Sequence, residues 1–205
     1  MKVHPGPRSE SVPMADSRTD TDFTFVDLFA GVGGMRLGFE AIGGRCIYTC
    51  EKDPHARAAY AANFVESSDH AWGEDIEVAV AEDAVPPHNV LLAGFPCQPF
   101  SKSGKQLGME EARGTLFYSI AKIVEAKKPR MVLLENVRNI AGPRHIHEWA
   151  VIIKTLRDLG YRVSSEPLVI SPHKIRPEFG GRPQVRDRVF ICATRLPDGV
   201  QEIPE

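Results

Sequence analysis

The 205-residue sequence lacks the features that would place it in several specialised classes of protein. No apolar run approaches the roughly 18 residues that a membrane-spanning helix needs, and residues 1–22 have no apolar core typical of a secretory signal. The four cysteines include no Cys-x-x-Cys pair, which argues against a zinc site and suits the reducing cytoplasm. With 42% hydrophobic and 25% charged residues, the composition is that of an ordinary globular domain.

Charge is also unevenly distributed, although the formal net charge is only -2. Residues 1–95 carry seven Lys and Arg against 15 Asp and Glu, whereas residues 96–188 carry 17 basic against nine acidic residues. A basic half suits a nucleic-acid partner, although basic residues that merely solvate helices would give the same counts. The asymmetry gains weight because the basic half also holds the candidate reactive residues.

Short apolar runs alternate with helical patterns along the chain. The runs expected to be strands cover residues 23–29, 46–50, 90–93, 131–134, 161–170 and 188–193, and the helical patterns cover 35–42, 54–63, 115–127 and 146–159. This alternation predicts an α/β fold, with a Rossmann-like, mainly parallel sheet that has helices on both faces. We expect one domain over residues 23–195, a disordered leader over 1–22 and a C-terminal tail over 196–205.

A glycine-rich turn, Phe29-Ala30-Gly31-Val32-Gly33-Gly34, joins the first expected strand to a helix. Glycines let a ligand approach the backbone, but the spacing departs from GxGxxG, which argues against NAD. Glu51 ends the second strand, where it is placed to accept hydrogen bonds from a ribose. Asp75, in Gly73-Glu74-Asp75-Ile76, lies near where a third strand should end between the runs 46–50 and 90–93. There it is placed to accept from an adenine amino group, with Ile76 against the ring. Each feature alone fits a tight turn with surface acids, whereas their recurrence at successive strand ends favours a nucleoside cofactor.

A cysteine follows the fourth expected strand in Gly94-Phe95-Pro96-Cys97-Gln98-Pro99-Phe100-Ser101. Two prolines make this segment a stiff loop rather than a strand interior, so a buried structural role suits Cys97 poorly. A free thiol has a pKa near ~8.5, and a nucleophilic cysteine therefore benefits from positive neighbours. The candidate neighbours are Lys102, Lys105, Arg186 and Arg188.

Polar residues also follow the fifth strand and precede the last one. Glu135 comes directly after four apolar residues, where a protonated or proton-shared carboxyl group would donate to a ring nitrogen; a helix-capping acid is the alternative. In Gln184-Val185-Arg186-Asp187-Arg188, strand alternation places both arginines on one face. They would anchor carboxylates or a base carbonyl, or would form a surface ion-pair edge.

These segments together resemble the DNA cytosine-C5 methyltransferase family over residues 23–193. The matching segments are DLFAGVGGMRLGFE, CEKD, GEDI, GFPCQPFSKSGKQ, RGTLF, LLENV and QVRDRV, in the order and spacing of the family. The resemblance implies S-adenosylmethionine as cofactor and double-stranded DNA as substrate, with no metal and no membrane. It implies cofactor contacts from Phe29, Gly31, Gly33, Gly34, Glu51, Asp75, Ile76, Gly94, Pro96 and Leu116.

The resemblance also implies roles for the reactive residues. A target cytosine would be flipped out of the duplex, Cys97 would attack C6, Glu135 would hydrogen-bond N3, and C5 would take the methyl group. Arg186 and Arg188 would hold the base and orient the two catalytic side chains. Contacts to DNA would come from Gln98, Ser101, Lys102, Ser103, Lys105, Arg113 and Asn136, most of them in a loop that closes over the duplex.

The sequence departs from the family pattern in three places. Lys52 replaces a large apolar or aromatic residue, which we expect to loosen cofactor binding slightly. Residues 171–183, SPHKIRPEFGGRP, form a longer and more basic loop than is usual before QxRxR. No target-recognition segment follows QVRDRV in these 205 residues. We expect a split or truncated enzyme that needs a second subunit for recognition, unless these residues are only part of a longer chain. The alternatives are an inactive remnant or regulatory module that binds DNA or cofactor, and an RNA cytosine methyltransferase.

Overall fold

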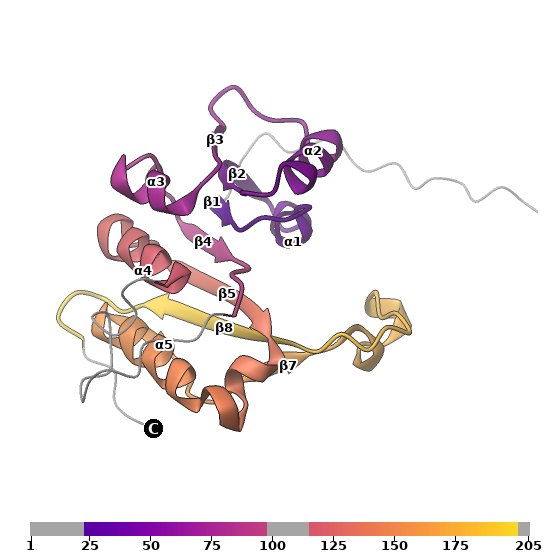
Figure 1. Cartoon of the computed structure of the whole chain (residues 1–205), viewed down its shortest axis with the longest axis vertical. Helices are drawn as coiled ribbons and strands as arrows, with labels where there is room; N and C mark the ends of the chain where they lie inside the picture. The colour runs from indigo at the N-terminus through magenta and orange to yellow at the C-terminus, as the bar shows by residue number, and fades with distance from the viewer. Residues whose placement is uncertain (1–22, 98–114, 201–205) are drawn as a thin grey trace, which may run out of the picture.

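An eight-stranded sheet forms the centre of the protein (Figure 1), with strand order β3-β2-β1-β4-β5-β8-β6 and with β7 also paired to β8. The computed structural model describes residues 23–97 and 115–200, so the expected leader, residues 98–114 and the last five residues lie outside it. The strands are β1 (Phe23–Leu28), β2 (Gly44–Cys50), β3 (Ala71–Gly73), β4 (Val90–Ala93), β5 (Met131–Val137), β6 (Tyr161–Val163), β7 (Leu168–Ile170) and β8 (Arg188–Arg195). The helices are α1 (Gly34–Glu40), α2 (Pro54–Asn63), α3 (Ile76–Ala81), α4 (Leu116–Lys127) and α5 (Ile146–Asp158).

The mainly parallel sheet predicted from the sequence is confirmed. Strands β1 to β5 pair in parallel, whereas β8 runs antiparallel to β5, β6 and β7. In a parallel sheet all strands end at the same side, where ligands of open α/β sheets bind. We call this side the carboxyl edge; the segments after β1 to β4, the end of β5 and the start of β8 all meet there. Within the described residues, no helix is long and apolar enough to cross a membrane.

Helices cover both faces of the sheet, as the sequence predicted. Side chains alternate along each strand, so neighbouring residues of β4 enter different apolar layers. Leu91 and Ala93 join the larger core with residues of α3, α4 and α5. Val90 and Leu92 join a smaller cluster that is completed by Met35 and Phe39 of α1.

The structure confirms the predicted positions of most helices and strands. The predicted strand bounds are wrong where pairing with neighbouring strands sets them. Helix α2 begins at Pro54 with Asp53 as its N-cap, whose side chain accepts from the next backbone amides at 2.7 and 2.9 Å. The single strand predicted over 161–170 is wrong, because β6 and β7 pair with different parts of β8. Strand β5 extends beyond its prediction to Val137, because its ladder with β8 continues through Glu135. Helix α3 has only six residues, too few for a helical period to show in the sequence.

A buried polar cluster packs beside the glycine turn. Asp27 of β1 is fully buried and accepts a hydrogen bond from the Tyr60 hydroxyl at 3.4 Å. Arg36 of α1, only 4% exposed, donates to the Glu66 carboxylate at 2.9 and 3.0 Å. Burial raises the pKa of Asp27 to about 8, an effect that the bond from Tyr60 and the charge of Arg36 only partly offset. Asp27 is therefore mostly protonated at neutral pH.

The turn between β1 and α1 requires glycine at position 33. Gly33 has a φ of 86°, in the left-handed region that favours glycine. A Cβ atom built there would lie 2.2 Å from a ring carbon of Phe64. At Gly34, the first residue of α1, the same atom would have no neighbour within 4 Å. Position 34 therefore has room for a side chain, whereas a side chain at position 33 would overlap Phe64.

We expect Gly33→Ala to lower the free energy of unfolding by about 2–5 kcal/mol, because left-handed strain and overpacking add. Gly34→Ala is the matched control and should be neutral or stabilising by up to ~1 kcal/mol, since alanine is the better helix former. Urea unfolding of both variants measures the difference. Equal effects of the two substitutions would show that the turn does not depend on the left-handed residue.

The buried Asp27 also predicts how stability changes with pH. In the unfolded chain its carboxyl group titrates near 3.8, and in the folded protein near 8. Between these values the folded state keeps a proton that the unfolded state has lost. The contribution of Asp27 is therefore fully present below pH 3.8 and falls by about 1.4 kcal/mol per pH unit until pH 8.

Asp27→Asn should remove this dependence, so its free energy of unfolding should fall less steeply than that of the natural protein between pH 5 and pH 8. Urea unfolding at several pH values in this window measures both slopes. Parallel profiles for the two proteins would mean that Asp27 does not hold its proton in the folded state.

Candidate active site

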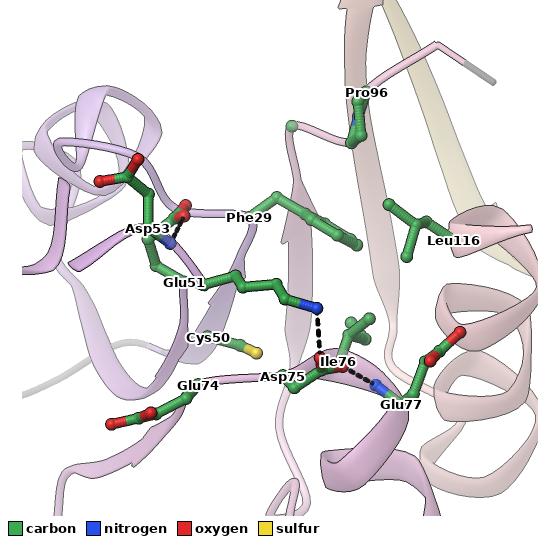
Figure 2. A pocket seen from close by; sticks show the side chains of 12 residues that line it. Phe29, Cys50, Glu51, Asp53, Glu74, Asp75, Ile76, Glu77, Pro96 and Leu116 are labelled. Atoms are coloured by element: carbon green, nitrogen blue, oxygen red, sulfur yellow. Dashed lines mark hydrogen bonds and ion pairs between the residues drawn. The ribbon is translucent and has the colours of Figure 1, made fainter. Parts of the chain in front are cut away.

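A pocket of about 690 Å³ opens at the carboxyl edge, between the segments that follow β1, β2, β3 and β4 (Figure 2). Its volume is typical of sites for small molecules and cofactors. The lining consists of Phe29, Cys50, Glu51, Lys52, Asp53, Glu74, Asp75, Ile76, Glu77, Gly94, Pro96 and Leu116. Seven of the ten residues that the sequence assigned to a cofactor are in this lining. The other three, Gly31, Gly33 and Gly34, form the adjoining turn and first helical residue.

Glu51 ties the glycine turn to the start of α2. Its Oε2 accepts from the backbone N–H of Gly31 at 2.8 Å, and its Oε1 accepts from the N–H of Asp53 at 2.8 Å. Gly31 has a φ of 56°, which directs its amide toward the end of the neighbouring strand. A carboxylate oxygen has more than one lone pair, so each oxygen of Glu51 is still able to accept from a ligand hydroxyl.

Asp75 and Lys52 meet in the lining of the pocket. The Asp75 Oδ1 caps α3 by accepting from the N–H of Glu77 at 2.9 Å, and its Oδ2 accepts from the Lys52 Nζ at 2.7 Å (Figure 2). The bond from Lys52 holds the pKa of the Asp75 carboxyl group below its usual range, so Asp75 is an ionised acceptor. Sequence reasoning treated Lys52 only as a loosening substitution and missed this contact, because the pairing joins the ends of two strands.

The pocket is strongly acidic. Five carboxylate side chains line it against the single ammonium group of Lys52. Apolar surface comes from Phe29, Ile76 and Leu116, which lie around the same space (Figure 2). This combination suits a ligand that joins a flat apolar ring system to hydroxyl groups and a positive charge.

A hydrogen bond from Asn136 to the backbone fixes the loop that carries Cys97. The Asn136 amide donates from Nδ2 to the Phe95 carbonyl oxygen at 2.8 Å, and its Oδ1 accepts from the N–H of Val137 at 2.8 Å. Asn136 is 2% exposed. Its amide is thus used inside the protein, which gives it a positioning role in place of the DNA contact that the sequence suggested.

Cys97 is half-buried and packs against the larger core. Burial raises the pKa of its thiol, and the negative charge of Glu148 raises it further. The positive neighbours expected from the sequence do not act on it among the described residues: neither Arg186 nor Arg188 offsets the shift, and Lys102 and Lys105 lie outside the described range. Glu148, a buried residue of α5, was missed because an acid in a first helical turn usually signals a helix start.

Glu135 meets Arg188 next to the cysteine loop. The Arg188 Nε lies 2.8 Å from the Glu135 Oε1, and both side chains are about a fifth exposed, at 21% and 23%. The Glu135 Oε2 lies 3.6 Å from the position of a Cβ built on Gly94, three residues before Cys97. The structure therefore brings the acid, the arginine and the cysteine loop together at the carboxyl edge.

The remaining predicted residues are less closely associated. Arg186 precedes β8, so strand alternation does not set its direction; its side chain is exposed and its backbone N–H donates to Ser171 Oγ at 3.0 Å. Six residues predicted to touch DNA lie outside the described residues: Gln98, Ser101, Lys102, Ser103, Lys105 and Arg113. Across residues 23–97 and 115–200, no group of three or more His, Cys, Asp or Glu is arranged to hold a metal ion.

Solved structures with a similar fold are methyltransferases. The Dnmt2 methyltransferase of S. pombe aligns with a TM-score of 0.59 at 21% identity, over 87% of this chain and 50% of that one. A DNMT2 variant from Spodoptera frugiperda aligns with a TM-score of 0.58 at 20% identity, over 89% and 55%. These likenesses establish the Rossmann-like fold of S-adenosylmethionine-dependent methyltransferases.

Sequence relatives are closer. The chain is 48% identical over 191 residues to the Type II methyltransferase M.AluI of Cellulosimicrobium cellulans, covering 91% of this chain and 36% of the relative. It is 41% identical over 175 residues to the Type II methyltransferase M.HhaI of Haemophilus parahaemolyticus, covering 85% and 50%. The chain thus spans half or less of the length of these relatives. Residues 23–204 match the family described as C-5 cytosine-specific DNA methylase, and the chain belongs to that family.

Proposed function

We propose that this chain supplies the cofactor-binding and catalytic part of a DNA cytosine-C5 methyltransferase. The observation that carries the proposal is the meeting of Glu135, Arg188 and the Cys97 loop beside the acidic pocket. A nucleophilic thiol next to a hydrogen-bonding carboxyl group, at the rim of a cofactor pocket, is the arrangement that covalent activation of a pyrimidine ring requires.

The pocket residues fit S-adenosylmethionine, which joins an adenosine to a positive sulfonium and an amino acid. The excess of carboxylates favours the positive charge. Glu51 would accept from the ribose hydroxyls, and Asp75 from the adenine amino group. Phe29, Ile76 and Leu116 would pack around the ring. When bound, the cofactor supplies a methyl group that is open to attack by a nucleophilic carbon.

The reaction that we propose begins with a cytosine turned out of the duplex. The Cys97 thiolate would add to C6, forming a carbon–sulfur bond and moving electron density toward N3 and C5. Glu135 would hydrogen-bond N3, and Arg188 holds Glu135 in place for this. C5 would then take the methyl group as its bond to the cofactor sulfur breaks, which leaves that sulfur neutral. Loss of the C5 proton to solvent and departure of the Cys97 thiolate would restore the aromatic ring.

Double-stranded DNA is the substrate that we propose, in keeping with the Type II methyltransferases to which the chain is similar. A second subunit that supplies target recognition remains a prediction from the sequence. An assay of the chain alone and with added cell lysate distinguishes a self-sufficient chain from one that needs a partner.

Methyl transfer from labelled S-adenosylmethionine to mixed-sequence duplex DNA tests the function. We expect Cys97→Ser to lower the rate by roughly 10³-fold or more, because the nucleophile is removed, while the Kd for the cofactor stays within about twofold. Cys192→Ser is the matched control, since Cys192 is exposed on β8 and outside the pocket lining.

Unimpaired methyl transfer by Cys97→Ser would refute the nucleophile assignment, and failure of that variant to bind the cofactor would refute the site. If the natural chain transfers nothing with or without lysate yet binds the cofactor, the proposed activity is wrong and a regulatory binding module takes its place.

Glu51→Ala should weaken cofactor binding by about 10- to 100-fold, equivalent to about 1.4–2.8 kcal/mol, because the variant cannot accept from the ribose or anchor the Gly31 amide. Isothermal titration calorimetry measures the affinity, and thermal unfolding without cofactor reports any general destabilisation. The control is Glu125→Ala on α4, which removes an exposed carboxylate outside the pocket lining. An unchanged Kd in Glu51→Ala would exclude Glu51 from the cofactor site.

A further inference from the structure

Residues 171–187, between β7 and β8, form a projecting segment that we call the arm. It contains two short 3-10 turns, η3 (Pro172–Lys174) and η4 (Pro177–Phe179), and it extends away from the sheet and its helices (Figure 1). Nearly all of its side chains are exposed. Of these residues only Arg186 was assigned to the catalytic site, so the rest of the arm needs another explanation.

The arm has a defined shape although it has no apolar core of its own. Its two limbs are joined by backbone bonds from His173 N–H to the Gln184 carbonyl at 3.3 Å and from Arg182 N–H to the Pro172 carbonyl at 3.1 Å. At its base, the buried Ser171 hydroxyl accepts from Arg186 N–H at 3.0 Å. A Cβ built on Gly181 would overlap a backbone carbonyl, so the limbs pack closely at the tip. Such a segment presents its side chains in fixed directions.

The charged side chains of the arm are mainly basic. Lys174, Arg176, Arg182 and Arg186 are all exposed, against two acids, Glu178 and Asp187. Arg138, on η1 (Arg138–Ala141) outside the arm, forms an ion pair with Asp187 at 2.9 Å. The Asp187 carboxylate therefore already has a cationic partner.

Within the part of the chain that the structure describes, no carboxylate forms an ion pair with Lys174, Arg182 or Arg186. Arg176 lies 3.4 Å from Glu178, and its guanidinium group also lies 4.6 Å above the Phe179 ring. Arg182 and Arg186 therefore offer positive charge that no ion pair neutralises inside the described chain, whereas Lys174 lies close enough to Asp187 to help lower the pKa of that carboxyl group.

The arm is attached directly beside the catalytic residues. Ile170, the last residue of β7, pairs with Arg188, and Arg188 is bonded to Glu135. A duplex that delivers a base to Cys97 and Glu135 must approach the carboxyl edge, where the arm begins. Its phosphates would then pass within reach of the basic side chains.

We propose that the arm binds the sugar-phosphate backbone of duplex DNA beside the target base, through Lys174, Arg176 and Arg182. This inference rests on the proposed function, because it takes DNA as the substrate. Ammonium and guanidinium groups bind phosphates regardless of sequence, so the arm contributes affinity and register and leaves target choice to other residues. The excess of basic over acidic side chains favours a phosphate backbone over a protein surface as its partner.

The test is the salt dependence of DNA binding by the full chain, measured by fluorescence anisotropy with a labelled mixed-sequence duplex. The arm variant carries Lys174→Gln, Arg176→Gln and Arg182→Gln. We expect it to bind more weakly at low salt and to reduce the slope of log K against log salt concentration by up to about 2.7, or about 0.9 for each phosphate that is no longer neutralised.

The matched control removes three exposed arginines at the opposite edge of the sheet, with Arg130→Gln, Arg162→Gln and Arg195→Gln. It loses the same charge and should keep the slope of the natural chain. Equal weakening by both variants would overturn the proposal, because net charge alone would then explain binding. Thermal unfolding of both variants confirms that they are folded.

Three further results would also overturn the inference: an unchanged slope in the arm variant, no salt-dependent binding by the natural chain, or preferential binding of RNA over duplex DNA. An unchanged slope would turn attention to Phe179 and Val185, 67% and 80% exposed, as a protein-docking surface. Methyl transfer is measured separately. A chain that binds DNA through the arm and transfers no methyl group would refute the proposed function and leave the arm assignment standing.

Discussion

The parallel ladder from β1 to β5 is the constraint on which both parts of the site depend. Because β1 pairs in parallel with β2 and β4, the glycine turn, Glu51 and the Cys97 loop emerge at the same edge. The pairing of β4 with β5 brings Glu135 to that edge as well. Reversing any one of these strands would move its terminal residues to the opposite side of the sheet. Cofactor pocket and reactive residues are thus neighbours as a result of topology.

Charge separates the two functions that meet at this edge. The acidic N-terminal half of the sequence supplies the carboxylates of the pocket, among them Glu51 and Asp75. The basic half supplies Arg188 and the arm. Under the proposed function, a cationic cofactor and polyanionic DNA would therefore meet surfaces of opposite sign.

Buried polar groups hold the Cys97 loop and the glycine turn in position. The Asn136 amide donates to the Phe95 carbonyl oxygen and accepts from the Val137 N–H, and these bonds fix the segment before Cys97. Asp27 and Arg36 do the same beside the glycine turn, through Tyr60 and Glu66. Left unbonded, such groups would destabilise the fold. The Asp27 Oδ1 has no hydrogen-bond partner among the residues that the structure describes, and burial instead favours the neutral form of this carboxyl group by raising its pKa to about 8.

The sequence by itself determined the α/β class, the start of α2 at Asp53 and Pro54, and the positions of the candidate site residues at strand ends, because apolar periodicity, capping chemistry and motif spacing are local properties. Only the tertiary structure decided that Lys52 binds Asp75, that Asn136 faces inward, and that burial and the charge of Glu148 raise the pKa of the Cys97 thiol. It also decided that residues 161–170 form two strands and that β5 includes Glu135. These features depend on contacts between segments far apart in the chain, and a linear pattern carries no information on which distant group completes a contact.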